Sequence, residues 1–561
     1  MQDNSQLGSQ GGSQRGSELS VLVVDPNPGM RASLQNLLTQ SGIGKIEFAV
    51  SAGTAIRQLM RRSYDVVLCE YDLGSGSEGQ DGQHLLEDLR QHKLISQQSI
   101  FIILTAEAVH GKVVSAAELA PTDYVLKPFT IEVLSRRIER ALDRRAALQD
   151  VHRLIEEGNL RAALRLCGAG AATASAASSR HAGDFARLGA ELQVMLGDLD
   201  GAIQQYQAVL AERPCGWASL GLARTLVAQH RHAEAAAVLD ELVVANPRLM
   251  AAYDLLAQCH AALGAPQRAQ RVLQDALAIS PHLVRRLRQL GEIALEAGDV
   301  ALAEKSFRQV VARARHSEFR DPEDHVNLVR ALVRKGEAQQ AGGVIRDLEK
   351  SLRAGAGVDA CKAYSNAMLF EAAGDAPAAG EALGAAVAAA VDATALSAKL
   401  KIGLARSCLQ HKFDDGAARV LMSMMRGAGI EGGAALSAPE ALAVLANAGR
   451  ADLADGLGKQ LGQQAQDLIV VAAEQTRGGD LKGAVQTMRE ARLKSPSSVP
   501  VTVAAALAML RQIDELGWDH ALGEGASALI DALRRLDEAH PQLKELQEQY
   551  ARVRRKYGIG S

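Results

Sequence analysis

A sequence repeat of about 34 residues runs through the middle of the chain. Four alanines mark the repeat, at successive intervals of 33, 34 and 34 residues: Ala202, Ala235, Ala269 and Ala303. A bulky residue follows each alanine by four positions (Tyr206, Leu239, Leu273 and Phe307), and a proline follows the first three alanines by 12 (Pro214, Pro247 and Pro281). A small alanine lets two helices approach closely, a bulky neighbour fills the space between them, and a proline ends the second helix. The period therefore predicts helix pairs stacked into an all-α solenoid.

These spacings resemble the tetratricopeptide (TPR) repeat, and the resemblance implies a scaffold that binds peptides or proteins in a groove. The repeat is regular over residues 184–320 and diverges over 321–425, where Ala341, Ala379 and Ala417 are 38 residues apart. We expect longer turns there. A first helical pair with a flexible Gly/Ala insertion is expected over 146–183. Further TPR-like repeats with capping helices are expected over 426–561.

The N-terminal part of the chain follows a different pattern. Residues 1–19 are rich in Gln, Ser and Gly and are expected to form a disordered tail. From residue 20 to about 145, short apolar runs alternate with amphipathic segments, which predicts a doubly wound α/β domain and a connector helix. We place its five parallel strands, in a flavodoxin-like sheet, at 21–25, 46–50, 65–70, 100–104 and 123–126. Helices are expected at 30–40 and 82–90.

Polar residues stand at the carboxyl ends of four of these strands: Asp25, Glu70, Thr105 and Lys127, the last followed by Pro128. Ligand sites of open parallel sheets lie at this edge. The motifs, with intervals of 45 residues from Asp25 to Glu70 and 22 from Thr105 to Lys127, resemble the receiver domain of two-component response regulators. The resemblance implies that Glu70 stands at the phosphoacceptor position, where the family has aspartate. It also makes Thr105 and Lys127 phosphoryl-sensing residues, Tyr124 the switch aromatic, and Asp25 and Asp72 the acidic pocket.

Three interpretations of Glu70 stay open. Its carboxylate, one methylene longer than that of aspartate, reaches Thr105 and Lys127 as a phosphoryl group would; or the pocket has decayed and serves only for docking; or the domain is phosphorylated on Asp72 or Glu70. The family binds Mg²⁺ through two adjacent acids and the acceptor, but Pro26 stands here where the second acid is expected. We therefore expect no cofactor and no metal site, with Mg²⁺ only if the pocket is still competent.

Composition narrows the choice of function. A net charge of −3 and an aromatic content of 3% argue against nucleic-acid binding and against general attraction to anionic membranes. The six cysteines are far apart and form no CxxC motif, which favours a reducing compartment. The chain has no apolar run of about 18 residues and no HExxH, GxSxG or P-loop motif. A cytoplasmic protein that is not an enzyme is expected.

Together these features predict a two-component signalling adaptor in which a pseudo-receiver is joined to a TPR scaffold. Its expected partners are other proteins bound in the TPR groove and, through the receiver-like pocket, a histidine kinase or another receiver. A homodimer is a further alternative; nucleic acid and membrane are not expected partners. The alternative function is a phosphorylatable response regulator in a phosphorelay, with the TPR array as its output domain.

Overall fold

The computed structural model describes residues 19–559, apart from 75–80, 97, 107–121, 173–175, 248, 281–283, 315–318, 394 and 427–437. Residues 1–18 of the expected tail and the candidate helix stop at Pro281 lie outside the described residues. The chain divides into two compact units, one ending at Arg320 and one beginning at Asp321, with residues 157–159 grouped with the second.

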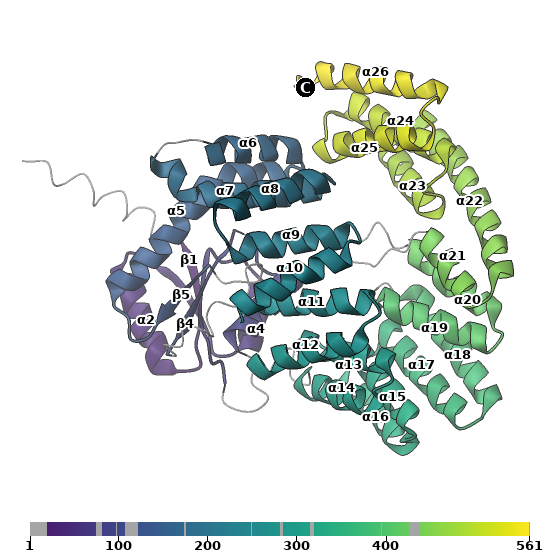
Figure 1. Cartoon of the computed structure of the whole chain (residues 1–561), viewed down its shortest axis with the longest axis horizontal. Coiled ribbons are helices and arrows are strands. Elements are labelled where there is room, and N and C mark those ends of the chain that lie inside the picture. Colours follow the sequence, from purple (N-terminus) through teal and green to yellow (C-terminus); the bar gives the residue numbers. More distant parts are fainter. Residues whose placement is uncertain are drawn as a thin grey trace, which may run out of the picture. The chain divides into compact units, whose positions relative to one another are not determined.

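The N-terminal domain contains a five-stranded parallel sheet of order β2-β1-β3-β4-β5. The domain is drawn in purple to blue in Figure 1. Its strands are β1 (Ser20–Val24), β2 (Lys45–Ala49), β3 (Val66–Glu70), β4 (Ile100–Thr105) and β5 (Asp123–Leu126). Its described helices are α2 (Pro28–Gln40), α3 (Ala52–Leu59), α4 (Gly82–Gln91) and α5 (Ile131–Glu156). The predicted fold class is confirmed.

Both faces of the sheet are buried, because side chains alternate along each strand. Leu22 and Val24 of β1 pack with α3 and α4 on one face, while Val21 and Val23 pack with α2 and α5 on the other. Continuous apolar strands are what a sheet covered on both faces requires. The domain therefore presents its functional groups at the strand ends rather than on a sheet face.

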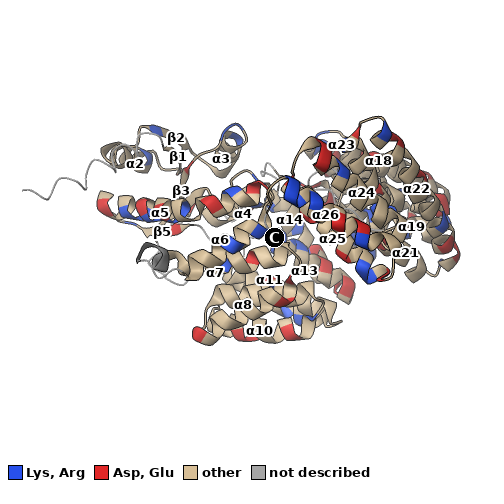
Figure 2. Cartoon of the chain, turned by 90° about the horizontal axis from the view of Figure 1, so that it is seen from above, with Lys and Arg blue, Asp and Glu red and all other residues tan. Residues whose placement is uncertain are grey.

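Helix α5 extends beyond the sheet and leads into the helical array. Its arginines are used in ion pairs: Arg137 with Asp123, Arg144 with Asp184 and Arg145 with Asp65. Acidic and basic residues also alternate along the helix (Figure 2). This arrangement argues against a nucleic-acid patch at the arginine-rich segment 136–145.

The array consists of helices throughout its described residues, as predicted. In the first unit they are α6 (Leu160–Ala172), α7 (Ala176–Met195), α8 (Leu199–Glu212), α9 (Gly216–Ala228), α10 (His232–Ala245), α11 (Met250–Ala262), α12 (Pro266–Ile279), α13 (Val284–Ala297) and α14 (Val300–Ala314). In the second they are α15 (Pro322–Lys335), α16 (Ala338–Ser351), α17 (Ala356–Ala372), α18 (Ala376–Asp392), α19 (Ala398–Gln410), α20 (Asp414–Arg426), α21 (Ala438–Asn447), α22 (Ala451–Arg477), α23 (Leu481–Lys494), α24 (Val499–Leu516), α25 (His520–Leu536) and α26 (Pro541–Lys556).

The residues that define the repeat lie inside the helix pairs. Each marked alanine is fully buried, and the bulky residues that follow are at most 4% exposed: Tyr206, Leu239, Leu273 and Phe307. Two of these rings pack against glycines of a neighbouring helix: Tyr206 of α8 against Gly221 of the following helix α9, and Phe307 of α14 against Gly291 of the preceding helix α13. A Cβ atom on Gly221 would lie 2.5 Å from the Tyr206 ring, and one on Gly291 would lie 2.8 Å from the Phe307 ring. Small and large residues thus interlock both within a pair (α13 and α14) and between successive pairs (α8 and α9), as close packing requires.

The expectation of longer turns in the divergent repeats is wrong. Between Ala341 and Ala379 the extra four residues lie in α17, which has 17 residues where α11 has 13. Between Ala379 and Ala417 most of the extra length lies in α18, which also has 17 residues. Alanine-rich sequence lengthens helices readily because alanine has the highest helix propensity.

The expected flexible insertion at 168–183 is also wrong for its described residues, since α6 continues to Ala172 and α7 begins at Ala176. Gly170 receives the ring of Phe185, whose atoms would lie 2.7 Å from a Cβ at that position. Glycine here permits close helix packing, and the resulting contact offsets its low helix propensity.

None of the helices formed by the described residues combines the length and the apolar character that a membrane span requires.

Candidate functional site

The sheet brings the four polar strand ends to one edge. β1 lies beside β3, β3 beside β4, and β4 beside β5, all parallel and in register. Glu70 pairs in register with Leu104, so Thr105 lies one position further along the neighbouring strand. Thr105 in turn pairs with Leu126, and the amide of Lys127 donates to the Thr105 carbonyl at 2.7 Å. The order of the strands thus places Asp25, Glu70, Thr105 and Lys127 together.

A charge network joins three of these residues. The Lys127 ammonium donates to Oε2 of Glu70 and lies 3.4 Å from Oδ2 of Asp25. All three side chains are largely buried, with exposed fractions of 16% for Lys127, 14% for Glu70 and 2% for Asp25. The Lys127 ammonium lies between the two carboxylates. Each buried acid therefore has a positive charge nearby that compensates in part for its loss of contact with water.

The remaining carboxylate oxygens also have partners. Oε1 of Glu70 accepts from the amides of Tyr71 at 2.9 Å and Asp72 at 3.3 Å. Oδ1 of Asp25 accepts from the Asn27 amide at 2.8 Å. Both acids are therefore held by hydrogen bonds as well as by charge.

This donor set does not fit Mg²⁺. A magnesium ion needs near-octahedral oxygen ligands, usually including carboxylates that are open to it. Here the ammonium of Lys127 lies between the two acids, and Pro26 offers no side-chain oxygen beside Asp25. The described residues also contain no cluster of three or more His, Cys, Asp or Glu able to hold a metal.

Residues 21–139 match the response regulator receiver domain family. The same region is 29% identical over 126 residues to the chemotaxis protein CheY of Pseudomonas aeruginosa, covering 22% of this chain and 98% of that protein. It is 27% identical to CheY-3 of Vibrio cholerae, over 22% of this chain and 93% of that protein. The N-terminal domain is a response regulator receiver.

Among solved structures, a tetratricopeptide repeat protein from Parabacteroides merdae aligns with 44% of this chain and 93% of its own, at 13% identity and a TM-score of 0.31. The response regulator CheY4 of Vibrio cholerae aligns with 22% of this chain and 99% of its own, at 20% identity and a TM-score of 0.20.

Asp72 is not in the receiver pocket, which corrects its assignment to the acidic pocket. Its side chain is exposed, and its Oδ1 accepts from the Gly74 amide at 3.2 Å, within its own turn. Two residues past the strand end, the chain has already turned away from the sheet edge. Asp25 and Glu70 are therefore the two carboxylates that meet Lys127.

Tyr124 lies inward on the receiver. Its hydroxyl donates to Oε1 of Gln83 on α4 at 3.4 Å, and its ring packs against the core between the sheet, α3 and α4. Burial, with the nearby phenol of Tyr71, raises the pKa of Tyr124. The aromatic ring thus contacts α4, the helix that follows the Glu70 loop.

Thr105 is also buried, at 3% exposed.

Sequence reasoning missed Arg31 of α2. Its guanidinium donates to the carbonyls of Asp25 at 2.6 Å and Pro26 at 2.9 Å, so a second positive charge lies at the end of β1. The interval of six residues from Asp25 could have indicated it, because that interval places Arg31 in the first turns of the following helix.

Helix α4 begins directly against the strand that carries Glu70. The Gly82 amide donates to the Tyr71 carbonyl at 2.7 Å, and a Cβ on Gly82 would lie 2.5 Å from the Glu70 carbonyl oxygen. Asp81 caps the helix by accepting from the His84 amide. Burial alone would lower the pKa of His84, but the Asp81 carboxylate raises it above its ordinary value.

We expect Gly82→Ala to destabilise the receiver by about 2 kcal/mol, because the added methyl forces α4 away from backbone atoms of β3. Amide hydrogen exchange of β3 and α4 in the whole chain would measure the change. Gly44→Ala is the matched control, since a Cβ there meets nothing within 4 Å, and it should be neutral or slightly stabilising. Equal exchange in the two variants would contradict the packing argument.

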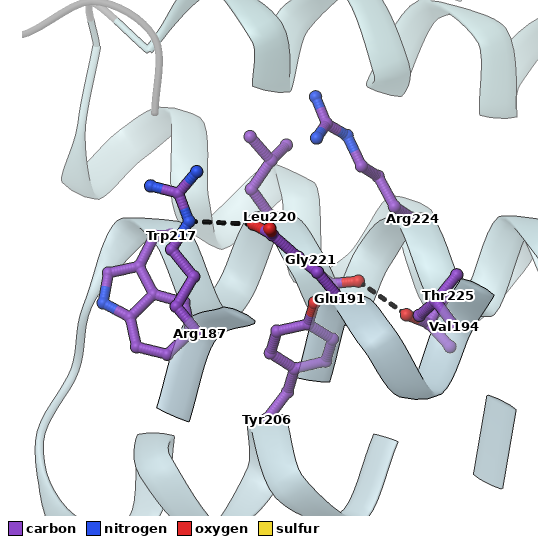
Figure 3. A pocket seen from close by; sticks show the side chains of 9 residues that line it. All are labelled: Arg187, Glu191, Val194, Tyr206, Trp217, Leu220, Gly221, Arg224 and Thr225. Atoms are coloured by element: carbon purple, nitrogen blue, oxygen red, sulfur yellow. Dashed lines mark hydrogen bonds and ion pairs between the residues drawn. The ribbon is translucent and has the colours of Figure 1, made fainter. Parts of the chain in front are cut away.

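The array contains a separate hollow of about 180 Å³ between α7, α8 and α9 (Figure 3). It is lined by Arg187, Glu191, Val194, Tyr206, Trp217, Leu220, Gly221, Arg224 and Thr225. Arg187 donates to Glu191 at 2.8 Å. Burial and the charge of Arg285 lower the pKa of Arg224 to about 10. No sequence interval marks Arg187 and Arg224, because they belong to different helices, α7 and α9, that the fold brings together.

Proposed function

We propose that this protein is a non-enzymatic two-component signalling adaptor. Its receiver acts as a pseudo-receiver in which Glu70, at the phosphoacceptor position, is permanently paired with Lys127. Its TPR-type array binds other proteins. The observation that supports this proposal is the charge network of Asp25, Glu70 and Lys127.

The network supports the first of the three interpretations of Glu70. A phosphoryl group on a receiver aspartate would bring negative charge to the lysine at the end of β5, and the longer glutamate side chain already brings a carboxylate there. Phosphorylation would instead require Glu70 to leave Lys127 and two backbone amides. It would also require a metal site that the present donor set does not fit.

On this proposal, the partners that bind the array are proteins, and a histidine kinase or another receiver docks on the pseudo-receiver. A second copy of the chain is another candidate for the same surface. The cysteines support a reducing compartment such as the cytoplasm, since all six are free thiols.

We expect the wild-type protein, incubated with a small-molecule phosphodonor and Mg²⁺, to gain no phosphoryl mass in intact mass spectrometry. Glu70→Asp tests the rest of the scaffold, because it restores the family's acceptor while leaving Asp25, Thr105 and Lys127 in place. Labelling of Glu70→Asp alone would identify the glutamate as the element that blocks phosphorylation. Labelling of the wild type would overturn the proposal in favour of a working response regulator with a TPR output domain.

A further inference from the structure

The outer face of α4 is covered, although α4 is a surface helix of the receiver. None of the residues from 81 to 90 is fully exposed, and the polar ones among them are all partly buried: Asp81, Gln83, His84, Glu87, Asp88 and Arg90. Helix α2 of the same domain has many exposed positions, including Ala32, Gln35 and Asn36. An amphipathic surface helix normally leaves its polar face to solvent. Another part of the same compact unit therefore lies over α4.

The electrostatic environment of Glu87 and Arg90 indicates which helices lie near α4. Burial raises the pKa of Glu87, while His84 and the hydrogen bond from Gln83 on α4 itself, and then the positive charges of Arg285 and Arg286 on α13, act in the opposite direction. Burial lowers the pKa of Arg90, and the like charge of Arg187 on α7 lowers it further. The arginines near α4 thus belong to two different repeats, since Arg285 and Arg286 are on α13 and Arg187 is on α7.

A ring contact fixes the far end of α4. His92, the C-cap of the helix, stacks on Phe319 with ring centroids 3.7 Å apart and planes 9° from parallel. Phe319 also packs against the receiver core on the side of α3 and α4. It belongs to the link between α14 and α15, at the end of the first compact unit.

The covering helices share one face of the array. α7 contacts α9, and α9 contacts α11. Asp254 of α11 accepts from Arg285 at 3.1 Å and from Arg286 at 2.7 Å, both on α13. We call the surface formed by α7, α9, α11 and α13 the first-helix face, because these are the first helices of their pairs. It bears Arg187, Arg224, Arg285 and Arg286, of which Arg286 is buried against Asp254 and Arg285 is half exposed.

We propose that helix α4 of the receiver is an intramolecular ligand of this first-helix face, with Glu87 directed to the arginines of α13 and His92 stacked on Phe319. Glu87 then lies near arginines of α13, whereas Arg90 lies near the like charge of Arg187, and this difference along α4 favours one orientation of the helix. While α4 is docked, this part of the array is closed to other acidic partners. The proposal goes beyond the adaptor function and does not depend on whether Glu70 is ever phosphorylated.

Cross-linking in the full-length protein tests the docking. Gln91→Cys and Arg320→Cys place thiols next to the stacked pair and leave His92 and Phe319 intact. A short bismaleimide should join these two positions within one chain, as seen by mass spectrometry of the linked peptides. The native cysteines do not interfere, since five are buried, one is half-buried, and each link is assigned by its peptides.

Glu87→Arg, added to this cysteine pair, should reduce the link on the order of tenfold and increase amide exchange over 82–91 to a similar extent. Glu139→Arg on the exposed side of α5 is the matched charge reversal, and it should change neither quantity. Unchanged exchange of β1 and β3 would confirm that the variants remain folded. The proposal is overturned if the link is absent, if it joins two chains, or if Glu87→Arg and Glu139→Arg behave alike.

Discussion

Lys127→Met is expected to destabilise the receiver by about 3 kcal/mol, because it leaves two buried carboxylates without their shared cation. Asp25 is almost fully buried and Glu70 is 14% exposed, so water compensates neither acid well. Methionine keeps most of the volume of the lysine stem, so packing changes little. Native-state hydrogen exchange of β1 and β3 in the whole chain would measure the loss.

A second substitution separates charge from packing. Lys127→Met combined with Glu70→Gln removes one of the two stranded charges and should recover part of the lost stability. Lys45→Met, on the exposed start of β2, should change stability by no more than about 0.5 kcal/mol. If Lys127→Met is as mild as Lys45→Met, the network does not hold the pocket in the way proposed.

Phe307→Ala is expected to destabilise the pair of helices α13 and α14 by about 3 to 4 kcal/mol. Phe307 is fully buried, and truncating such a ring removes its transfer free energy and leaves a cavity. Hydrogen exchange of α13 and α14 would report the change. Leu263→Ala, at a site that is 47% exposed in the turn after α11, should have little effect.

The glycine that faces this ring gives the sharper test. Gly291→Ala should destabilise the wild type, since its Cβ would lie 2.8 Å from the Phe307 ring. In Phe307→Ala the same substitution meets a cavity and gains up to about 1 kcal/mol of helix propensity. The sign of the Gly291→Ala effect should therefore reverse between the two backgrounds. The same sign in both would show that ring and glycine do not interlock.

Much of the receiver could be predicted because its signals are local. Apolar runs that end in Asp25, Glu70, Thr105 and Lys127 locate both the strands and the shared edge of the sheet. The direction in which a side chain points past a strand end is not local information. Asp72 could therefore be grouped with the pocket although its carboxylate binds its own turn.

The array could be predicted as helix pairs because alanine spacing reports the length of a whole repeat. That spacing does not say how the length is divided between helix and turn, so the longer α17 and α18 were missed. The arginines of the first-helix face were missed for a related reason. Arg187, Arg224 and Arg285 come together only through the stacking of helices far apart in sequence, and no interval between them marks that arrangement.

The additional turn of α17 breaks the equivalence of successive repeats. Its four extra residues make it about 6 Å longer than a 13-residue helix such as α19, while rotating its packed side by only about 40°. The helix therefore keeps its buried stripe and is longer than α15, α16 and α19, while α18 has the same length. If all repeats were equal, an elongated partner bound along them could shift by one repeat and make the same contacts. Its position along the array would then not be unique. The lengthened helices α17 and α18 mark one position in the second unit, so that an alignment of such a partner at this pair differs from its alignment at a shorter pair such as α15 and α16.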